Sequence, residues 1–151
     1  RLYLNNELAT NKFSLNGQVI TLSDISAPMF VVGTEADHVA PWTSVYKIGN
    51  LVKSDDYSFL LTSGGHNAGI IAGPVHPKRH FRLKTKGLKT AQIGTQEWLQ
   101  TTEKQPGSWW PAWQQWLQAH SSGQTKPPPL GAPSKGYRSI EDAPGSYVRQ
   151  R

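Results

Sequence analysis

Cysteine is absent from this chain of 151 residues. Its absence excludes disulfide bonds, thiolate metal sites and a cysteine nucleophile within these residues. No apolar run comes near the ~20 residues that a transmembrane helix needs. The first residues, Arg1-Leu2-Tyr3-Leu4, lack the apolar core of a signal peptide. An initiator methionine is also missing, so we expect this sequence to be a fragment of a longer protein.

Acidic residues are scarce in the second half of the chain, and the charge is therefore uneven. The net charge is +6; residues 1–75 carry four basic and six acidic side chains, whereas residues 76–151 carry twelve and four. Six of the basic residues lie between positions 78 and 89. Such an asymmetry favours a polyanionic partner, whether a phosphate-bearing ligand, a nucleic acid or a charged surface. A basic face that contacts only solvent explains it as well.

Hydrophobic periodicity predicts a strand, a helix and a second strand in the first half of the chain. The continuous apolar run at residues 29–32 is typical of a strand buried in a parallel sheet, and residues 57–62 are predicted to form the next strand. Residues 43–52 place apolar side chains along one side of a helix. Together these segments predict one βαβ unit with a right-handed crossover. Before them, an Asn-Gly pair predicts a hairpin over residues 12–22.

The second half of the chain is expected to hold two helices and an extended tail. We predict one helix over residues 95–103, capped by Thr95, and a second that begins at a Ser108 cap. The second helix is apolar around much of its circumference, so we expect it to dock on the sheet with Trp113 and Trp116 buried. Its large apolar residues are Trp109, Trp110, Trp113, Trp116 and Leu117. Residues 121–134 are rich in glycine, proline and serine, which is typical of an extended tail.

Each predicted strand is followed by glycine and then by a residue capable of acid–base chemistry. Asp37 follows the first strand, and His66 follows the second. Parallel strands end at the same edge of a sheet, so we expect the two side chains within hydrogen-bond reach there. Alone, Asp37 is explained as a turn carboxylate and His66 as a loop histidine. As a pair, they match the order in which an α/β-hydrolase presents the acid and the histidine of its triad.

The remaining ionisable residues fit structural explanations better. We expect a structural role for His38, and solvated turns explain Asp55 and Asp56. His76 and His80 are four residues apart, a spacing used for metal ligands on helices, but a proline separates them and no carboxylate falls in register. No metal site is therefore predicted. A nucleophile would precede Asp37 in a hydrolase triad, and nothing in this sequence resembles one.

Five segments of the chain resemble the polyhydroxyalkanoate synthases, which polymerise hydroxyacyl thioesters. The segment around Asp37 resembles the family's catalytic aspartate motif, and the segment around His66 resembles its histidine motif. The tryptophan block and the final segment are more specific, because many hydrolases share the first two patterns. The five segments are residues 2–6 (LYLNN), 32–42 (VGTEADHVAPW), 63–69 (SGGHNAG), 107–113 (GSWWPAW) and 137–148 (YRSIEDAPGSYV).

This resemblance implies the carboxyl-terminal part of an acyltransferase that polymerises (R)-3-hydroxyacyl-CoA. The family uses a cysteine nucleophile, which His66 would activate, while Asp37 would activate the 3-hydroxyl of the next monomer or assist the histidine. The cysteine is missing here, so the fragment alone is expected to be inactive. Acyl-CoA would be a substrate, with no cofactor, and Arg79 and Arg82 are candidates for binding its phosphates. A growing polyester chain, granule-associated proteins and a second copy in a homodimer are the other expected partners, with no nucleic acid.

The fold class expected is α/β, the carboxyl-terminal portion of an α/β-hydrolase, with a tryptophan-rich helix and an extended tail. Residues 1–120 would form part of the catalytic domain, and residues 121–151 the tail. The expected location is the cytoplasm, at the surface of a polyester granule. Two alternatives stay open: an esterase or depolymerase of the same fold, and a non-catalytic basic module that binds a polyanion or a granule.

Overall fold

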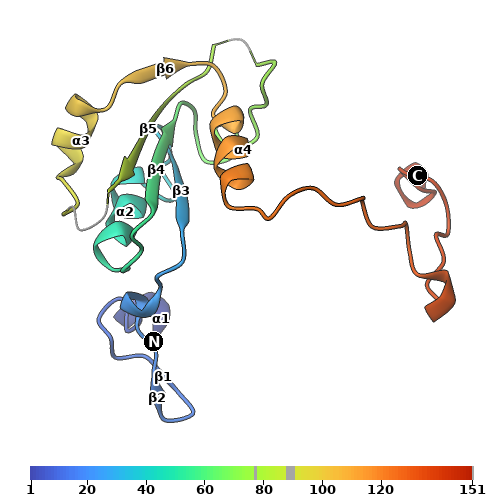
Figure 1. Ribbon diagram of the computed structural model, residues 1–151, viewed down its shortest axis with the longest axis horizontal. Helices are drawn as coiled ribbons and strands as arrows, with labels where there is room; N and C mark the ends of the chain where they lie inside the picture. The colour runs from blue at the N-terminus through green and yellow to red at the C-terminus, as the bar shows by residue number, and fades with distance from the viewer. Residues whose placement is uncertain (77, 88–90, 151) are drawn as a thin grey trace. The chain divides into compact units, whose positions relative to one another are not determined.

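The computed structural model describes residues 1–76, 78–87 and 91–150. The chain divides into two compact units, residues 1–120 and residues 121–151. The first unit holds a mixed β-sheet with helices on both faces (Figure 1). In the second unit, the described residues form two short 3₁₀ helices, η3 (Pro133–Lys135) and η4 (Tyr147–Arg149), joined by turns and extended chain. Among the described residues, no helix is long and apolar enough to span a membrane.

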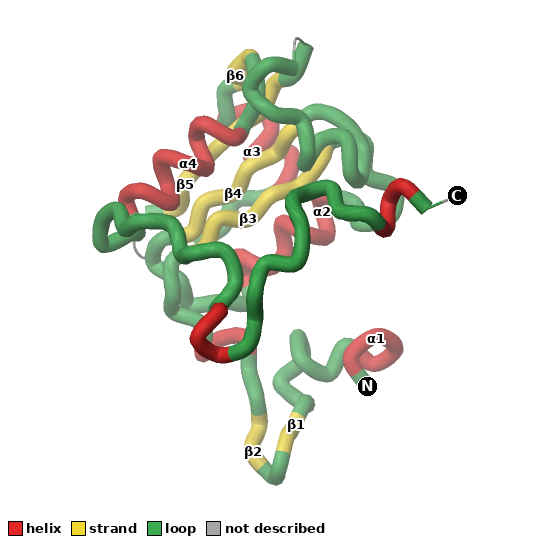
Figure 2. The backbone as a smooth tube through the Cα atoms, turned by 90° about the vertical axis from the view of Figure 1, so that its right-hand side faces the viewer, coloured by secondary structure: helices red, strands yellow, loops and turns green. Residues whose placement is uncertain are grey.

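The sheet of the first unit has four strands in the order β3-β4-β5-β6 (Figure 2). Strands β3 and β4 run parallel in register, from Met29 opposite Tyr57 to Thr34 opposite Thr62. The other two pairings are antiparallel. The bounds are β3 Met29–Thr34, β4 Tyr57–Thr62, β5 His80–Lys86 and β6 Lys104–Pro106. The two predicted strands and their parallel pairing are thus confirmed, and all six residues of β4 are buried.

Strand β5 was not predicted from the sequence, where its residues belong to the basic segment at positions 78–89. The burial of its residues does not alternate cleanly: Phe81 is buried, Arg82 and Leu83 are half-buried, and Lys84 is exposed. The last basic residue of the segment, Lys89, lies outside the described residues.

The connection between β3 and β4 is less regular than the predicted helix over residues 43–52. It consists of helix α2 (Trp42–Val45) followed directly by the 3₁₀ helix η2 (Tyr46–Asn50). Gly49 is a poor residue for the second turn of an α-helix. The backbone of Gly49 also lies against the side chains of Gln92 and Tyr57, so close that a methyl group would not fit. Tight packing here requires the small residue.

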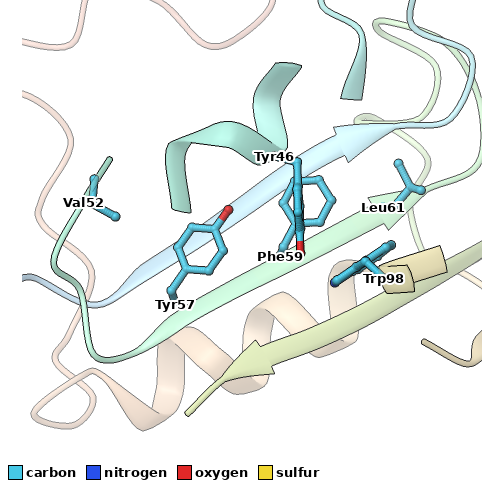
Figure 3. Packing of buried hydrophobic residues seen from close by; sticks show 6 residues of the cluster. All are labelled: Tyr46, Val52, Tyr57, Phe59, Leu61 and Trp98. Atoms are coloured by element: carbon cyan, nitrogen blue, oxygen red, sulfur yellow. The ribbon is translucent and has the colours of Figure 1, made fainter. Parts of the chain in front are cut away.

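One face of the sheet is covered by η2 and helix α3 (Thr95–Thr101). Figure 3 shows the aromatic cluster at its centre, in which the ring of Trp98 from α3 meets Phe59 of β4 edge to face at 5.2 Å between centroids. The cluster consists of Tyr46, Val52, Tyr57, Phe59, Leu61 and Trp98. Helix α3 begins at Thr95 as expected, but Gly94 occupies the cap position and makes no side-chain cap. The prediction of a Thr95 cap was therefore wrong.

The opposite face is covered by helix α4 (Trp110–Ala119). Trp109, just before the helix, is buried against Leu60 and Phe81 of the sheet, and Trp116 packs on Phe30 at 5.6 Å between ring centroids. Trp113, however, is 39% exposed, and Trp116 is only half-buried. The expectation that both would be largely buried was wrong, because a single helix packed on a sheet buries one stripe of residues and leaves the others outside.

The amino-terminal segment contains helix α1 (Leu2–Asn5), the hairpin of β1 (Ser14–Leu15) and β2 (Gln18–Val19), and the 3₁₀ helix η1 (Leu22–Asp24). The hairpin confirms the prediction from the Asn-Gly pair. Both turn residues, Asn16 and Gly17, have positive φ, at 50° and 79°. A two-residue turn of this type matches the twist of the paired strands and favours Asn and Gly in these places.

Candidate active site

Asp37 and His66 meet at one end of the sheet, in the turns that follow β3 and β4. The Oδ2 atom of Asp37 lies 2.9 Å from Nδ1 of His66. The parallel register of the two strands carries on past their ends, since the backbone N–H of Ala36 donates to the carbonyl of Gly64 at 2.9 Å. The sheet thus sets the separation of the two turns, and the predicted contact between the side chains is present.

The Asp37 carboxylate is held firmly by its own turn. Its Oδ1 atom accepts hydrogen bonds from the backbone N–H groups of Val39 at 2.9 Å and Ala40 at 2.8 Å. Thr34 donates its hydroxyl to Oδ2 at 3.4 Å, and the side chain is only 8% exposed. The Ala40 N–H and, next, the His66 imidazole lower the pKa of Asp37 to about 2. The carboxylate is therefore ionised throughout the neutral range.

The second ring nitrogen of His66, Nε2, is the atom available for chemistry. An ionised carboxylate only accepts hydrogen bonds, so Nδ1 of His66 carries the proton that faces Asp37. Nε2 is then the unprotonated nitrogen, and 48% of the side chain is exposed. An imidazole in this state is a general base, oriented by its carboxylate, for a group that approaches from outside.

Glycines allow the loop around His66 to fold tightly. Gly64 has φ of +108°, in a region that side-chain-bearing residues rarely adopt, and Arg79 lies beside it. At Gly69, an added methyl carbon would lie 2.7 Å from the Thr34 side chain and 2.9 Å from the carbonyl oxygen of Ser63. The loop consequently packs directly on the end of β3, next to the Asp37 turn.

The two arginines proposed for phosphate binding both donate to backbone carbonyls. Arg79 donates from Nη2 to Ala68 at 3.1 Å and from Nη1 to Ser63 at 3.4 Å, and so supports the His66 loop from both sides. Arg82 donates to the carbonyl of Thr102. A guanidinium has five N–H donors, so neither bond excludes a second partner. Binding of acyl-CoA by Arg79 and Arg82 stays a prediction.

Two further histidine–carboxylate contacts are present that the sequence analysis did not predict. Nε2 of His80 lies 3.0 Å from Oε2 of Glu35, two residues before Asp37. Nε2 of His120 lies 2.8 Å from Oδ2 of Asp56, at the opposite end of β4. Asp56 is thus paired, whereas the sequence suggested a solvated turn carboxylate. Glu35 lies within the segment that contains Asp37, but its partner His80 belongs to strand β5, which was not predicted from the sequence.

The described part of the chain contains no group of three or more histidine, cysteine, aspartate or glutamate side chains that could hold a metal ion. His76 and His80, four residues apart, do not form such a group: His76 is exposed, and His80 pairs with Glu35. His38 is also exposed. The arrangement at the sheet end is therefore an acid–histidine pair, and no cysteine nucleophile can accompany it within these residues, because the sequence has no cysteine.

The chain is similar to poly(3-hydroxyalkanoate) polymerases along almost its whole length. It is 36% identical over 149 residues to the polymerase subunit PhaC of Rhizobium etli, which covers 99% of this chain and 22% of that protein. With the PhaC subunit of Cupriavidus necator it shares 34% over 150 residues, or 99% of this chain and 24% of that protein. A polymerase of Methylorubrum extorquens is 33% identical over 150 residues. No protein-family model matches the chain. The chain spans less than a quarter of the length of these relatives.

Proposed function

Because this chain belongs to the poly(3-hydroxyalkanoate) polymerase family, we propose that it supplies the aspartate and the histidine of that polymerase's active site. The observation that carries the proposal is the 2.9 Å contact between Asp37 and His66 at the end of two parallel strands. The reaction would be the transfer of (R)-3-hydroxyacyl groups from coenzyme A to a growing polyester. The fold would be the corresponding portion of an α/β-hydrolase, which the parallel β3–β4 unit supports.

The nucleophile would be a cysteine outside these residues. His66 would take the thiol proton on Nε2, and the thiolate would attack the thioester carbonyl of the acyl-CoA. The carbon–sulfur bond to coenzyme A would break, and the leaving thiolate would receive the proton held by the imidazolium. In the next step, the 3-hydroxyl of a second monomer would attack the enzyme-bound acyl group while His66 takes the hydroxyl proton. The bond from the acyl carbon to the cysteine sulfur would break, and the leaving cysteine thiolate would receive that proton from the imidazolium.

The surroundings of Asp37 favour one of its two suggested roles. Oδ1 is occupied by two backbone N–H groups, Oδ2 faces His66, and the side chain is almost buried. Little of the carboxylate is left for direct contact with a substrate hydroxyl. We therefore assign Asp37 the orientation of His66 and the stabilisation of the imidazolium, in preference to activation of the 3-hydroxyl.

Substitution of His66 tests this function in a polymerase of family length that contains residues 1–151. His66→Gln should lower the rate of coenzyme A release by about 100-fold or more, because the general base is lost. His76→Gln is the matched control, since His76 is exposed and lies outside the site. A His66→Gln enzyme as active as the His76→Gln control would refute the proposal.

Arg79 and Arg82 would attract the phosphates of coenzyme A with those guanidinium N–H groups that do not donate to backbone carbonyls. Replacing both by glutamine should raise the KM for acyl-CoA more than it lowers kcat, and added salt should reduce the difference from the wild type. An unchanged KM at low ionic strength would leave these arginines with their structural contacts alone. The expected homodimer, the granule partners and the cytoplasmic location stay proposals that rest on the resemblance to the family.

A further inference from the structure

A second histidine–carboxylate pair lies beside the candidate catalytic pair. His80 is the first residue of β5, and Glu35 follows β3; the two strands are separated by β4. The contact of 3.0 Å between Nε2 of His80 and Oε2 of Glu35 therefore spans the central strand of the sheet. Both side chains are partly exposed, at 27% for His80 and 33% for Glu35.

Hydrogen bonds of the backbone fix both members of this second pair beside the end of β4, at Thr62 and Ser63. Glu35 donates its N–H to the carbonyl of Thr62 at 2.9 Å, and Asp37 follows two residues later. His80 accepts the N–H of Ser63 at 2.9 Å and donates its own N–H to the Ser63 hydroxyl at 3.1 Å. Ser63 opens the loop that carries His66. Glu35 thus precedes the aspartate turn in the chain, and His80 is bonded to the first residue of the histidine loop.

These contacts form a closed ring. It runs from Asp37 to His66 through their side chains, along the loop to Ser63, across to His80, and through the side chains to Glu35, two residues from Asp37. The backbone hydrogen bond from Ala36 to Gly64 already joins the two turns, and the ring adds a side-chain link between Glu35 and His80 beside it. Arg79 supports the same loop through its hydrogen bonds to the carbonyl groups of Ser63 and Ala68.

From this ring we infer that Glu35 and His80 are positioning residues that hold Asp37 and His66 at their contact distance. The inference deepens the proposed function and rests on it for its effect on polymerisation. Neither residue is assigned contact with substrate. Since misplacement of a catalytic group by 1 Å costs on the order of 100-fold in rate, a partial loosening should cost about tenfold in kcat, with little change in KM.

Variants in the family-length polymerase separate positioning from general stability. Glu35→Ala and His80→Phe should each lower kcat about tenfold, and the double variant should be no slower than either single one, because both break the same contact. Glu35→Gln retains an acceptor oxygen and should restore most of the activity. Asp56→Ala is the matched control, since it breaks the contact of Asp56 with His120, of 2.8 Å, at the other end of β4.

A spectroscopic measurement on the 151-residue chain does not depend on polymerase activity. The Nδ1 proton of His66, held by Asp37, should give a downfield, protected resonance in nuclear magnetic resonance spectra. Glu35→Ala should broaden or shift that resonance, and Asp56→Ala should not. Equal effects of the two variants on both the resonance and kcat would overturn the inference. A His66→Gln enzyme that stays active would instead refute the proposed function, while the resonance would still report on the ring of contacts.

Discussion

Replacement of Asp37 by asparagine is the sharpest test of the site, because the two carboxylate oxygens of Asp37 have different partners in the structure. Oδ1 accepts the N–H groups of Val39 and Ala40, so the asparagine carbonyl oxygen should occupy that place and preserve the turn. The amide NH₂ must then face His66 and Thr34. Because this group donates hydrogen bonds, it favours the imidazole tautomer in which Nδ1 accepts and Nε2 carries the proton.

That tautomer cannot act as a base through Nε2, although every heavy atom is nearly where it was. The same substitution in the serine protease triad lowers kcat by about 10⁴-fold for this reason. Since His66 is 48% exposed and freer to reorient, we expect a loss of roughly 10³-fold for Asp37→Asn. Its KM should change little, because the carboxylate is directed at the histidine.

The assay is the initial rate of coenzyme A release by a polymerase of family length that contains residues 1–151. Nitrogen chemical shifts of His66 in the 151-residue chain would report the tautomer, and thermal unfolding would show whether the turn is preserved. Activity within a few-fold of the wild type, from a variant in which Nε2 is shown to be protonated, would refute the reasoning. Loss of activity without the tautomer change would assign Asp37 a different role.

Three further predictions concern stability. Trp98→Ala should cost about 3–5 kcal/mol in chemical denaturation, because its ring is 2% exposed, whereas Trp113→Ala should cost much less. His120 donates to the carbonyl of Trp116 and pairs with Asp56, and these contacts together raise the pKa of His120. The stability that the protonated imidazole adds to the fold should be fully present below about pH 6.5 and should be lost as the pH rises through the pKa of His120 in the folded state. His120→Gln should abolish this pH dependence. Gly64→Ala should lower the unfolding midpoint, because φ of +108° strains alanine; an unchanged midpoint would show that the loop can relax.

The central parallel pair was predictable because its sequence is simple. Residues 29–32 are apolar without interruption, residues 57–62 are mostly apolar, and each run stops at a glycine or shortly before one, so strand, turn and reactive residue are visible in order. The contact between Asp37 and His66 followed from topology alone, since parallel neighbours end at one edge. The hairpin turn was equally local, because positive φ at two consecutive residues selects Asn and Gly.

What sequence reasoning missed depends on pairing between distant segments. Strand β5 is basic, and it can be recognised as a strand only from its pairing with the buried β4. Without β5, His80 had no place near Glu35, and the second pair could not be foreseen. For helix α4, composition showed that tryptophans were abundant but not which of them face the sheet, which depends on the crossing of the helix over Phe30 and Leu60.

Several contacts that orient the candidate base come from within this chain, although the proposed cysteine nucleophile does not. Asp37 is fixed by Val39 and Ala40, His66 is fixed by Asp37, and the loop of His66 is fixed by β5. A general base is effective only when its orientation is set before the substrate arrives. Under the proposed function, the sheet therefore supplies that orientation within these residues, and the cysteine thiol would need to approach the partly exposed His66 side chain at Nε2.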